Sequence, residues 1–582
     1  MRYIALACDY DGTLADDGTV RDEVTDALRR LRESGRRLVL VTGRDLRELR
    51  RVYPGLDLFE YVVAENGGLL YHPATRTERP LAQGVDDRFV RALEAHNVEP
   101  LTVSRVMVAT REPHEAEVLE IIRDLGLELQ VMFNKGAVMV LPAGVNKATG
   151  LRAALREMGV SRHNVVGVGD AENDHALLSL CEVGVAVANA LPALREKADL
   201  VTEHPAGAGV VELVERMIED DLRSLDPRLG RYAVLAGRTV DGEPLTIQPY
   251  HGLLLIAGTS GSGKSTIATG MLERFAEQGY EFCLIDPEGD YGPFARAIVL
   301  GDKDHPPTIE EISQVLERPG VNVIVNLLAV KLADRAAFFD ELLPRIHQLR
   351  ARTARPHWLV IDEAHHMLQP PLAQPRTPLV QVLDNTALLT PHPQMIAAPV
   401  LERVDMLIAV GDEVTTTVGA LADALSIAPP PDVPERLDAG EALLWAPGRA
   451  RHVVRFVPAP SQVERRRHER KYAEGELGAE RSFYFRGPGG RLKLRAQNLL
   501  MFLQMADGVD ADTWWHHLLR GDYSRWFVEM IKDEDLAAEA RAIEANRALS
   551  LDESRALMRA AIEARYTLPG TAPTGSQQAP PQ

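Results

Sequence analysis

Apolar runs that end in acidic residues constrain the fold of this 582-residue chain most strongly. One run, IALAC, ends at Asp9 and Asp11, and another, VVGVG, ends at Asp170 and Asp174. Short continuous apolar runs are typical of strands buried on both faces of a parallel sheet. Because the carboxyl ends of parallel strands meet at one edge, we expect these carboxylates to converge there. They would repel one another unless a cation lay between them, and oxygen ligands of this kind suit Mg²⁺.

Helical and extended patterns alternate over about the first 220 residues. The amphipathic segment at 22–34 fits a crossover helix between two apolar runs. The alternation predicts a parallel sheet with helices on both faces. Residues 83–142 carry an alternation of their own, which predicts a small α/β subdomain inserted into the larger one.

Groups that bind phosphate stand between the two acidic pairs. Thr42, Gly43 and Arg44 end the apolar run LVLV, and Lys147 lies in GVNKATGL. A hydroxyl, backbone N–H groups and an ammonium are what a phosphoryl group requires.

These residues resemble the motifs of the haloacid dehalogenase (HAD) superfamily. The chain has DxDGT at 9–13, Thr42, Lys147 and GDxxND at 169–174, in the order of that family. The insertion between the second and third motifs, together with VVAENGGLLY at 62–71, resembles the Cof-like, sugar-phosphatase and phosphoglycolate-phosphatase branch. The resemblance covers about residues 1–220. It implies a Rossmann-like parallel sheet with an inserted α/β cap, acting on a small phosphorylated substrate.

The resemblance also implies a role for each matching residue. Asp9 would be the nucleophile that forms an aspartyl-phosphate, and Asp11 would be the general acid and then the base. Mg²⁺ would be held by Asp9, by the backbone carbonyl of Asp11 and by Asp170, with Asp174 supporting the metal shell. Lys147 would act in catalysis by positioning the phosphate, which Thr42, Gly43, Arg44 and Asn173 would also bind.

A second phosphate-binding signature follows the first domain. GTSGSGKS fits the pattern GxxxxGK[ST] between an apolar run and a helical pattern. In such a loop, backbone N–H groups face the phosphates of ATP, Lys264 would reach the β- and γ-phosphates, and Ser265 would bind Mg²⁺. The apolar run HWLVI ends at Asp362, which would support the Mg²⁺ shell, and Glu363, which would polarise the attacking water. The predicted nucleotide-binding residues are Gly258, Thr259, Ser260, Gly261, Ser262, Gly263, Lys264, Ser265, Thr266 and Asp362.

CLIDPEGDY at 283–291 and IDEAHH at 361–366 are similar to the HerA/FtsK-type ATPases, over about residues 228–450. That resemblance implies a P-loop α/β domain and a homo-oligomer, because related ATPases complete their sites between subunits. The chain departs from the family at two places. It has Thr390-Pro391-His392-Pro393 where the family has Thr-Gln-x-Pro. It also lacks the basic helix that carries an arginine acting across the subunit boundary, for which Arg376 and Arg403 are the nearest candidates.

Composition limits the partners and the compartment. The net charge of −19 argues against a generally basic protein that coats nucleic acid, but a local patch is enough for binding. Three cysteines cannot form a disulfide framework, which favours a reducing compartment. Every apolar run is far shorter than the ~20 residues of a membrane span. We therefore expect a cytoplasmic protein without a membrane partner.

A basic stretch at 463–472 precedes a helical, aromatic C-terminal region. The basic stretch is most simply a solvated linker helix. The alternative is that its cations, with the aromatic triplet that follows, bind a nucleic-acid backbone and stack bases. The cations are Arg465, Arg466, Arg467, Arg470 and Lys471, and the aromatic residues are Phe483, Tyr484 and Phe485.

The predicted organisation has three domains and a tail. They are a HAD phosphatase domain at 1–222 with its cap at 83–142, a HerA/FtsK-like ATPase domain at 223–460, a basic linker and small helical domain at 461–566, and a disordered tail at 567–582. The predicted function is a Mg²⁺-dependent HAD phosphohydrolase fused to a module that binds and hydrolyses ATP. Two other functions stay open. One is a machine that works on nucleic acid and removes its end phosphates, and the other is a bifunctional kinase–phosphatase.

Overall fold

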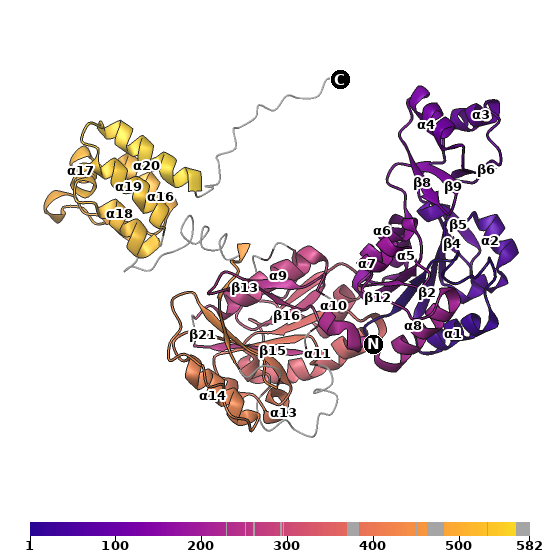
Figure 1. Cartoon of the computed structure of the whole chain (residues 1–582). Coiled ribbons are helices and arrows are strands. Elements are labelled where there is room, and N and C mark those ends of the chain that lie inside the picture. Colours follow the sequence, from indigo (N-terminus) through magenta and orange to yellow (C-terminus); the bar gives the residue numbers. More distant parts are fainter. Residues whose placement is uncertain are drawn as a thin grey trace. The chain divides into compact units, whose positions relative to one another are not determined.

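The computed structural model describes residues 1–228, 230–250, 252–259, 262–291, 294, 296–368, 383–448, 452–462, 482–531 and 533–565 (Figure 1). The chain divides into two compact units, Met1–Ala459 and Pro460–Gln582. The predicted disordered tail and the basic stretch at 463–472 lie outside the described residues.

The first sheet has the strand order β12-β11-β10-β1-β2-β3-β4-β5. Strands β12 to β3 are parallel, and β4 and β5 continue the sheet antiparallel. Helices cover both of its faces (Figure 1), which confirms the predicted fold class. The strands are β1 (Ala5–Cys8), β2 (Arg37–Val41), β3 (Tyr61–Ala64), β4 (Leu69–His72), β5 (Thr77–Pro80), β10 (Val165–Gly169), β11 (Val183–Ala186) and β12 (Leu200–Val201). The helices are α1 (Asp22–Glu33), α2 (Leu46–Val52), α5 (Lys147–Met158), α6 (His175–Leu180), α7 (Pro192–Lys197) and α8 (Ala206–Asp220).

A small α/β subdomain is inserted between β5 and α5, within the segment predicted to be a cap. Its antiparallel sheet has the order β6-β7-β9-β8 and packs against two helices through a core that includes Phe89, Val118 and Val138. The elements are β6 (Thr102–Val103), β7 (Val108–Arg111), β8 (Leu129–Asn134), β9 (Ala137–Pro142), α3 (Asp87–Ala95) and α4 (Glu115–Asp124).

The second large sheet has the order β14-β13-β23-β22-β21-β15-β20-β19-β16-β18-β17. Its strands from β21 to β17 are parallel, whereas β22, β23, β13 and β14 extend one edge antiparallel. The strands are β13 (Val234–Thr239), β14 (Pro244–Ile247), β15 (Leu253–Gly258), β16 (Phe282–Asp286), β17 (Ala297–Leu300), β18 (Asn322–Asn326), β19 (Trp358–Ile361), β20 (Thr386–Thr390), β21 (Val404–Val410), β22 (Ala442–Trp445) and β23 (Val454–Pro458). The helices are α9 (Lys264–Gln278), α10 (Ile309–Leu316), α11 (Leu332–Thr353), α13 (Ala398–Leu401) and α14 (Val414–Ala424).

Buried polar side chains connect the two large sheets within the first unit. His163, just before β10, stacks on Tyr280, just before β16, with ring centroids 3.8 Å apart. Both bind Glu182, which precedes β11: His163 Nδ1 lies 2.7 Å and the Tyr280 hydroxyl 3.0 Å from its carboxylate. Arg355, which precedes β19, donates a hydrogen bond of 3.2 Å to the carbonyl of Gly159, and Gly159 ends α5. We call these contacts together the junction. They lie at the amino ends of the strands in both sheets.

The second unit is a helical domain with one hairpin. Phe483 and Phe485 are 6% and 0% exposed and pack with Trp514 in its core. The alternative in which these two rings stack bases is therefore wrong, because they fill the domain interior. Ser550 and Glu553 form the capping box that begins α20. The elements are β24 (Phe483–Phe485), β25 (Leu494–Ala496), α16 (Leu499–Gly508), α17 (Ala511–Leu518), α18 (Asp522–Trp526), α19 (Glu534–Ala545) and α20 (Leu551–Arg565).

Cys8, Cys181 and Cys283 are all free and buried. Among the described residues, no helix combines the length and the apolar character that a membrane crossing requires.

Candidate active sites

Three buried carboxylates lie at the carboxyl ends of β1 and β10. These strands are parallel neighbours, with Cys8 opposite Val168, so Asp9 and Asp170 leave the sheet at the same edge. Asp174 follows one turn later, and the oxygens of the three carboxylates lie within 4.8 Å of one another. Each of the three residues is at most 4% exposed. The structure thus brings together three of the four predicted acidic side chains.

Asp11 faces this cluster with its backbone rather than with its carboxylate. The carboxylate accepts two hydrogen bonds from Arg44, both of 2.7 Å. Arg44 also pairs with Glu48 at 2.8 Å. In this structure Arg44, a predicted phosphate-binding residue, therefore holds the Asp11 carboxylate. The Asp11 carbonyl oxygen and Asp170 Oδ2 meet at one ammonium group, that of Lys135, at 3.0 and 2.8 Å.

Lys147 is buried between two of the carboxylates. Its Nζ lies 2.6 Å from Asp9 Oδ1 and 2.6 Å from Asp174 Oδ1. It is the first residue of α5, whose start is fixed by a capping box between Asn146 and Thr149. Burial lowers the pKa of Lys147, but the charges of Asp174 and Asp9 outweigh it and hold the pKa above its usual value. The side chain is therefore a fixed cation.

The donor set fits a divalent cation. Burial raises the pKa of Asp9 well above its usual value, Asp174 adds to the rise, and Lys147 opposes it. The three buried carboxylates contact two ammonium groups, the buried one of Lys147 and the half-exposed one of Lys135, so an added cation would balance the remaining negative charge. Asp174 Oδ2 accepts the backbone N–H groups of Asp170 and Ala171 at 3.0 Å each, while its Oδ1 binds Lys147. Asp174 is therefore suited to support the site, and Asp9, Asp170 and the Asp11 carbonyl to hold the metal.

The predicted phosphate-binding residues lie beside the carboxylates. Thr42 follows β2, the strand next to β1, and its Oγ1 accepts the backbone N–H of Arg44 at 3.1 Å. A side chain at Gly43 would lie 3.6 Å from Asn173 Nδ2, which shows that these two predicted residues are neighbours. Asn173 Nδ2 donates to Asn66 at 3.2 Å, and its Oδ1 is buried without a hydrogen-bond partner.

Two residues that connect the cap to the site are absent from the predicted set. Glu65 has a φ of 51°, and its carboxylate accepts the backbone N–H of Val106 at 2.7 Å, which fixes the chain leading into β7. Lys135 lies on the turn between β8 and β9 and reaches Asp11 and Asp170. The sequence could have indicated Glu65, because the polar segment ENG interrupts the apolar residues of VVAENGGLLY. The turn FNKGA has no comparable feature that would indicate Lys135.

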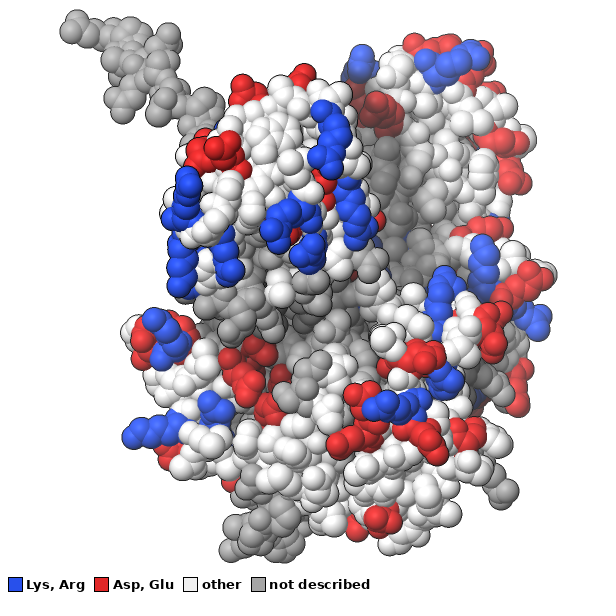
Figure 2. Space-filling view, turned by 90° about the vertical axis from the view of Figure 1, so that its left-hand side faces the viewer, with Lys and Arg blue, Asp and Glu red and all other residues white. Residues whose placement is uncertain are grey.

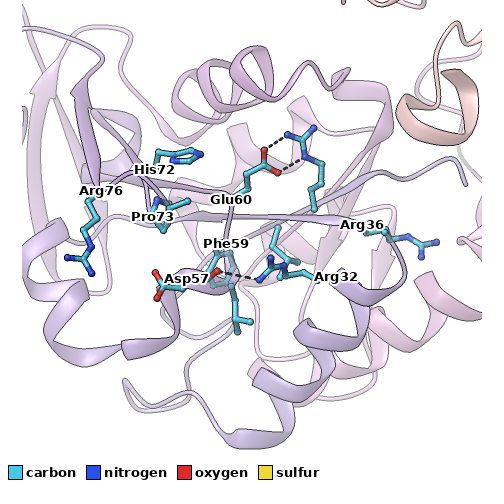
Figure 3. Close-up of a pocket in the computed structure, with 13 residues that line it drawn as sticks. Arg32, Arg36, Asp57, Phe59, Glu60, His72, Pro73 and Arg76 are labelled. Carbon is cyan, nitrogen blue, oxygen red and sulfur yellow. Dashed lines mark hydrogen bonds and ion pairs between the residues drawn. The ribbon is translucent and has the colours of Figure 1, made fainter.

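A cavity of about 580 Å³ lies elsewhere in this domain (Figure 3). It is lined by Arg32, Arg36, Glu60 and Arg76 and adjoins the amino end of β2. The reaction residues follow the carboxyl ends of the strands, so this cavity lies at the opposite edge of the sheet. It takes no part in the site.

Comparisons with known proteins place the first domain. Residues 6–118 and 98–214 match the sequence model of the haloacid dehalogenase-like hydrolases. The chain is 32% identical over 221 residues to the phosphoglycolate phosphatase of Methanothermobacter thermautotrophicus, which covers 37% of this chain and 98% of that protein. The chain belongs to the haloacid dehalogenase-like hydrolases. It is also 28% identical over 225 residues to phosphoglycolate phosphatase 2 of Saccharolobus solfataricus, covering 37% of this chain and 92% of the relative.

Among solved structures, this haloacid dehalogenase-like hydrolase is similar to a haloacid dehalogenase-like hydrolase from Bacteroides thetaiotaomicron. The two are 19% identical with a TM-score of 0.33, and the match covers 37% of this chain and 99% of the other.

A second candidate site lies in the other large sheet of this haloacid dehalogenase-like hydrolase. β15 is buried throughout and leads into the loop that ends at α9. A side chain at Gly258 would lie 2.1 Å from the Val410 carbonyl, so only glycine fits there. Lys264, the first residue of α9, donates to the carbonyls of Gly258 and Thr259 at 3.0 Å each. Ser260 and Gly261 lie outside the described residues.

The acidic pair Asp362 and Glu363 follows β19. Burial raises the pKa of Asp362 to about 7 and also raises that of Glu363. Burial lowers the pKa of Lys264, and the negative charges of Glu363 and Asp362 oppose this change. Only β20 separates β19 from β15 in the sheet, which brings the loop and the acidic pair to the same edge.

The chain departs from the HerA/FtsK-type family at the sensor segment and at the arginine, and the structure describes Thr390 and Arg403 at these places. Thr390 Oγ1 accepts the backbone N–H of His392 at 2.9 Å and lies 3.2 Å from His365 Nδ1. His365 in turn is 3.3 Å from Glu363, so a histidine lies beside the predicted water-polarising residue. Arg403 pairs with Asp384 at 3.1 Å just ahead of β21, at the edge opposite the loop. Arg376 lies outside the described residues.

Residues 253–370 of this hydrolase match the sequence model of the central domain of helicase HerA. The chain is therefore a fusion of a haloacid dehalogenase-like hydrolase with a HerA-like domain, as its motifs predict.

Proposed function

We propose that the first domain hydrolyses a small phosphate monoester with the help of Mg²⁺. The observation that carries this proposal is the buried Asp9 carboxylate, 2.6 Å from the Lys147 ammonium and beside Asp170 and Asp174. A Mg²⁺ ion held by Asp9, the Asp11 carbonyl and Asp170 would neutralise charge on the phosphoryl oxygens. Thr42, Gly43 and Asn173 would hold those oxygens at the ends of neighbouring strands.

The chain's own residues supply the rest of the chemistry. A carboxylate oxygen of Asp9 attacks phosphorus while the bond to the leaving oxygen breaks, and Asp11 gives that oxygen a proton. Water then attacks the aspartyl-phosphate, Asp11 takes up a proton, and phosphate leaves with Asp9 regenerated. In this structure the Asp11 carboxylate binds Arg44 at 2.7 Å, so both transfers require that it turn from Arg44 toward the reacting oxygen.

The test is phosphate release by Asp9→Asn protein. The change keeps the size of the side chain and removes the nucleophilic oxygen anion. We expect phosphate release by the Asp9→Asn protein to be lower by about three orders of magnitude or more. We expect phosphate release by the unchanged protein to require Mg²⁺. The measurement is phosphate release from a panel of sugar phosphates, phosphoglycolate and phosphorylated oligonucleotides, with circular dichroism as the folding control. An active Asp9→Asn protein contradicts the proposal.

For the HerA-like domain we propose ATP binding and hydrolysis. Lys264 and Ser265 begin α9 at the carboxyl end of β15, where helix N–H groups favour phosphate, and Asp362 and Glu363 follow β19 at the same edge of the sheet. Binding of a fluorescent ATP analogue should be lost in Lys264→Ala protein.

We also propose a homo-oligomer, and this proposal rests on the resemblance to HerA alone. A monomeric mass in light scattering, with and without ATP, contradicts it.

A second candidate function, work on nucleic acid, is favoured by the C-terminal unit. Figure 2 shows Lys and Arg side chains gathered on one face of that unit. A hollow of about 630 Å³ there is lined by Arg486, Arg520 and Arg525 together with Tyr484 and His516. Cations around aromatic rings suit a single strand, whose phosphates pair with arginine and whose bases stack.

Salt-dependent retention on single-stranded DNA tests this second function. Binding should weaken steeply as salt rises, because phosphate contacts release counterions. Replacing Arg520 and Arg525 by Gln should reduce both the affinity and the salt slope. Arg547→Gln, another arginine of this unit that is exposed and outside the hollow, is the control. Equal retention of all three proteins rules out the hollow as the binding site.

A further inference from the structure

Two histidines follow the acidic pair at the end of β19. The chain continues there as a single tight turn, the 3-10 helix η6 (Ala364–His366). Glu363 enters this turn in the left-handed conformation, with a φ of 47°, which is uncommon for a residue with a side chain. The turn brings three side chains together. One carboxylate oxygen of Glu363 and one ring nitrogen each of His365 and His366 lie within 4.8 Å of one another.

The spacing of one pair in this group matches a tetrahedral metal site. Zn²⁺ binds imidazole nitrogen at about 2.0–2.1 Å and carboxylate oxygen at about 2.0–2.2 Å, so two such ligands of a tetrahedron lie about 3.3–3.5 Å apart. Nδ1 of His365 is 3.3 Å from Oε2 of Glu363. No separation in the group exceeds 4.8 Å, a difference that rotation of the half-buried His366 side chain is able to close.

The neighbouring strand β20 holds the ring of His365. Thr390 Oγ1 accepts the backbone N–H of His392 at 2.9 Å, so its hydroxyl proton is available to Nδ1 of His365, 3.2 Å away. This hydrogen bond requires an unprotonated Nδ1, the form in which imidazole binds a metal, and a metal ion would take the place of the hydroxyl proton. The ring of His392 packs edge-on against that of His365, with centroids 5.4 Å apart. The segment that departs from Thr-Gln-x-Pro thus adds a third imidazole beside the group.

The donor atoms of this group differ from those of the proposed Mg²⁺ site beside it. Ser265 and Asp362 offer oxygen, which suits Mg²⁺, whereas imidazole nitrogen suits Zn²⁺ and other transition-metal dications. Two imidazoles and one carboxylate occupy three positions of a tetrahedron and leave the fourth to water. The side chains of Glu363 and His365 are only 19% and 6% exposed, so they are largely withdrawn from competing water.

We propose that Glu363, His365 and His366 bind a transition-metal dication of the Zn²⁺ type, and that this ion inhibits ATP hydrolysis. The metal withdraws charge from the carboxylate of Glu363, which then no longer polarises the attacking water. ATP binding should persist, because the proposed phosphate contacts are made by the loop and by Lys264. The metal site stands apart from the functions proposed above, whereas its inhibitory effect rests on the proposed ATP hydrolysis.

The first test is the visible absorption of Co²⁺, used in place of Zn²⁺, on the full chain with excess Mg²⁺ and no nucleotide. Mg²⁺ fills the sites that offer only oxygen, and four-coordinate Co²⁺ absorbs far more strongly than the octahedral aquo ion. We expect an intense Co²⁺ band that Zn²⁺ abolishes. His366→Gln should weaken Co²⁺ binding by at least about 10- to 100-fold, because losing a ligand costs no less than losing a group that only orients a ligand.

His305→Gln is the matched control, because it removes an exposed histidine that also lies beside a carboxylate, that of Asp302 at 3.2 Å. It should bind Co²⁺ like the unchanged protein. Glu363→Gln keeps both histidines and the size of the side chain, and it should weaken binding as His366→Gln does, with circular dichroism as the folding control. An octahedral Co²⁺ spectrum in the unchanged protein, or equal affinity in the His366→Gln and Glu363→Gln proteins, overturns the site.

The second test is ATP hydrolysis at saturating Mg²⁺, with free Zn²⁺ fixed by a chelating buffer. Zn²⁺ should lower kcat of the unchanged protein by a factor of about 10² or more, the usual contribution of a general base, and leave binding of a fluorescent ATP analogue in place. His366→Gln protein should need at least about tenfold more free Zn²⁺ for the same inhibition, and His305→Gln protein should not. Equal sensitivity of the two variants overturns the inhibitory role. A lack of ATP hydrolysis without Zn²⁺ contradicts the proposed ATPase function instead, and the Co²⁺ spectrum, which needs no turnover, still decides the site.

Discussion

At the scale of single residues, the first site depends on one buried cation. Lys147 lies 2.6 Å from both Asp9 and Asp174, and all three side chains are buried. Removing one partner of a buried charge network leaves the others uncompensated and typically costs about 3–5 kcal/mol. Lys147→Met keeps much of the volume, so its effect reports the charge rather than a cavity.

We expect Lys147→Met to destabilise β1 and α5 locally by about 3–5 kcal/mol. The rate of amide hydrogen exchange in these elements should then rise by a factor of roughly 10² to 10³ or more. Hydrogen–deuterium exchange of peptides from these elements measures it, region by region. Mg²⁺ should recover part of the protection, because it supplies the missing positive charge. Lys197→Met, at an exposed position on α7, is the control and should change little. Full protection in the Lys147→Met protein contradicts the electrostatic account.

At the scale of elements, α5 carries Lys147 to the site through close packing. Gly150 lies one turn after Lys147, and a side chain there would be 2.4 Å from Val63 and 2.7 Å from the Cα of Gly67. Residues three apart share a helix face, so any shift of α5 at Gly150 also moves Lys147. The helix approaches β3 this closely only because the residue has no side chain.

Gly150→Ala should therefore push α5 away from β3. We expect a loss of about 1–3 kcal/mol in stability from overpacking and a fall in phosphatase kcat/KM of about 10- to 100-fold from the displaced Lys147. Steady-state kinetics with a generic phosphate ester gives the second value. Arg152→Ala, an exposed position on the same helix, should leave both values nearly unchanged. Normal kinetics of the Gly150→Ala protein would show that the helix position is not decisive.

At the scale of the whole molecule, the first unit holds two candidate sites made of separate residues. The junction of His163, Glu182 and Tyr280 lies at the amino ends of strands, whereas both sites lie at the carboxyl ends. Each candidate site also has its own predicted phosphate-binding cation, Lys147 in one and Lys264 in the other. The two activities should therefore be separable.

Lys264→Ala should abolish ATP binding and hydrolysis and leave hydrolysis of a small phosphate ester nearly unchanged, and Asp9→Asn should do the reverse. Any effect of ATP on the phosphatase should be modest, on the order of 1–3 kcal/mol, because the junction touches neither set of reaction groups. Both activities measured on both variants provide the check. Loss of phosphatase activity in folded Lys264→Ala protein would indicate one composite site.

The sequence by itself determined the two families, the fold class and the residues at strand ends. Asp9, Asp170, Lys264 and Asp362 each stand directly after a buried apolar run or at a helix start, so local pattern is enough to find them. The aromatic triplet at 483–485 shows where this reasoning fails. An apolar ring is equally suited to stacking on a base and to filling a core, and the choice falls to the packing of distant helices.

Only the tertiary structure decided which side chains meet across long stretches of chain. Lys135 reaches Asp11 over 124 residues and Tyr280 binds Glu182 over 98, contacts that no periodicity records. The same holds for Arg44, which the motif assigns to phosphate but which pairs with Asp11. Spacing along the chain fixes how a side chain leaves its own strand or helix. The cation, carboxylate or ring that it meets depends on how the sheets, the cap and the junction pack, and that packing is a property of the whole unit.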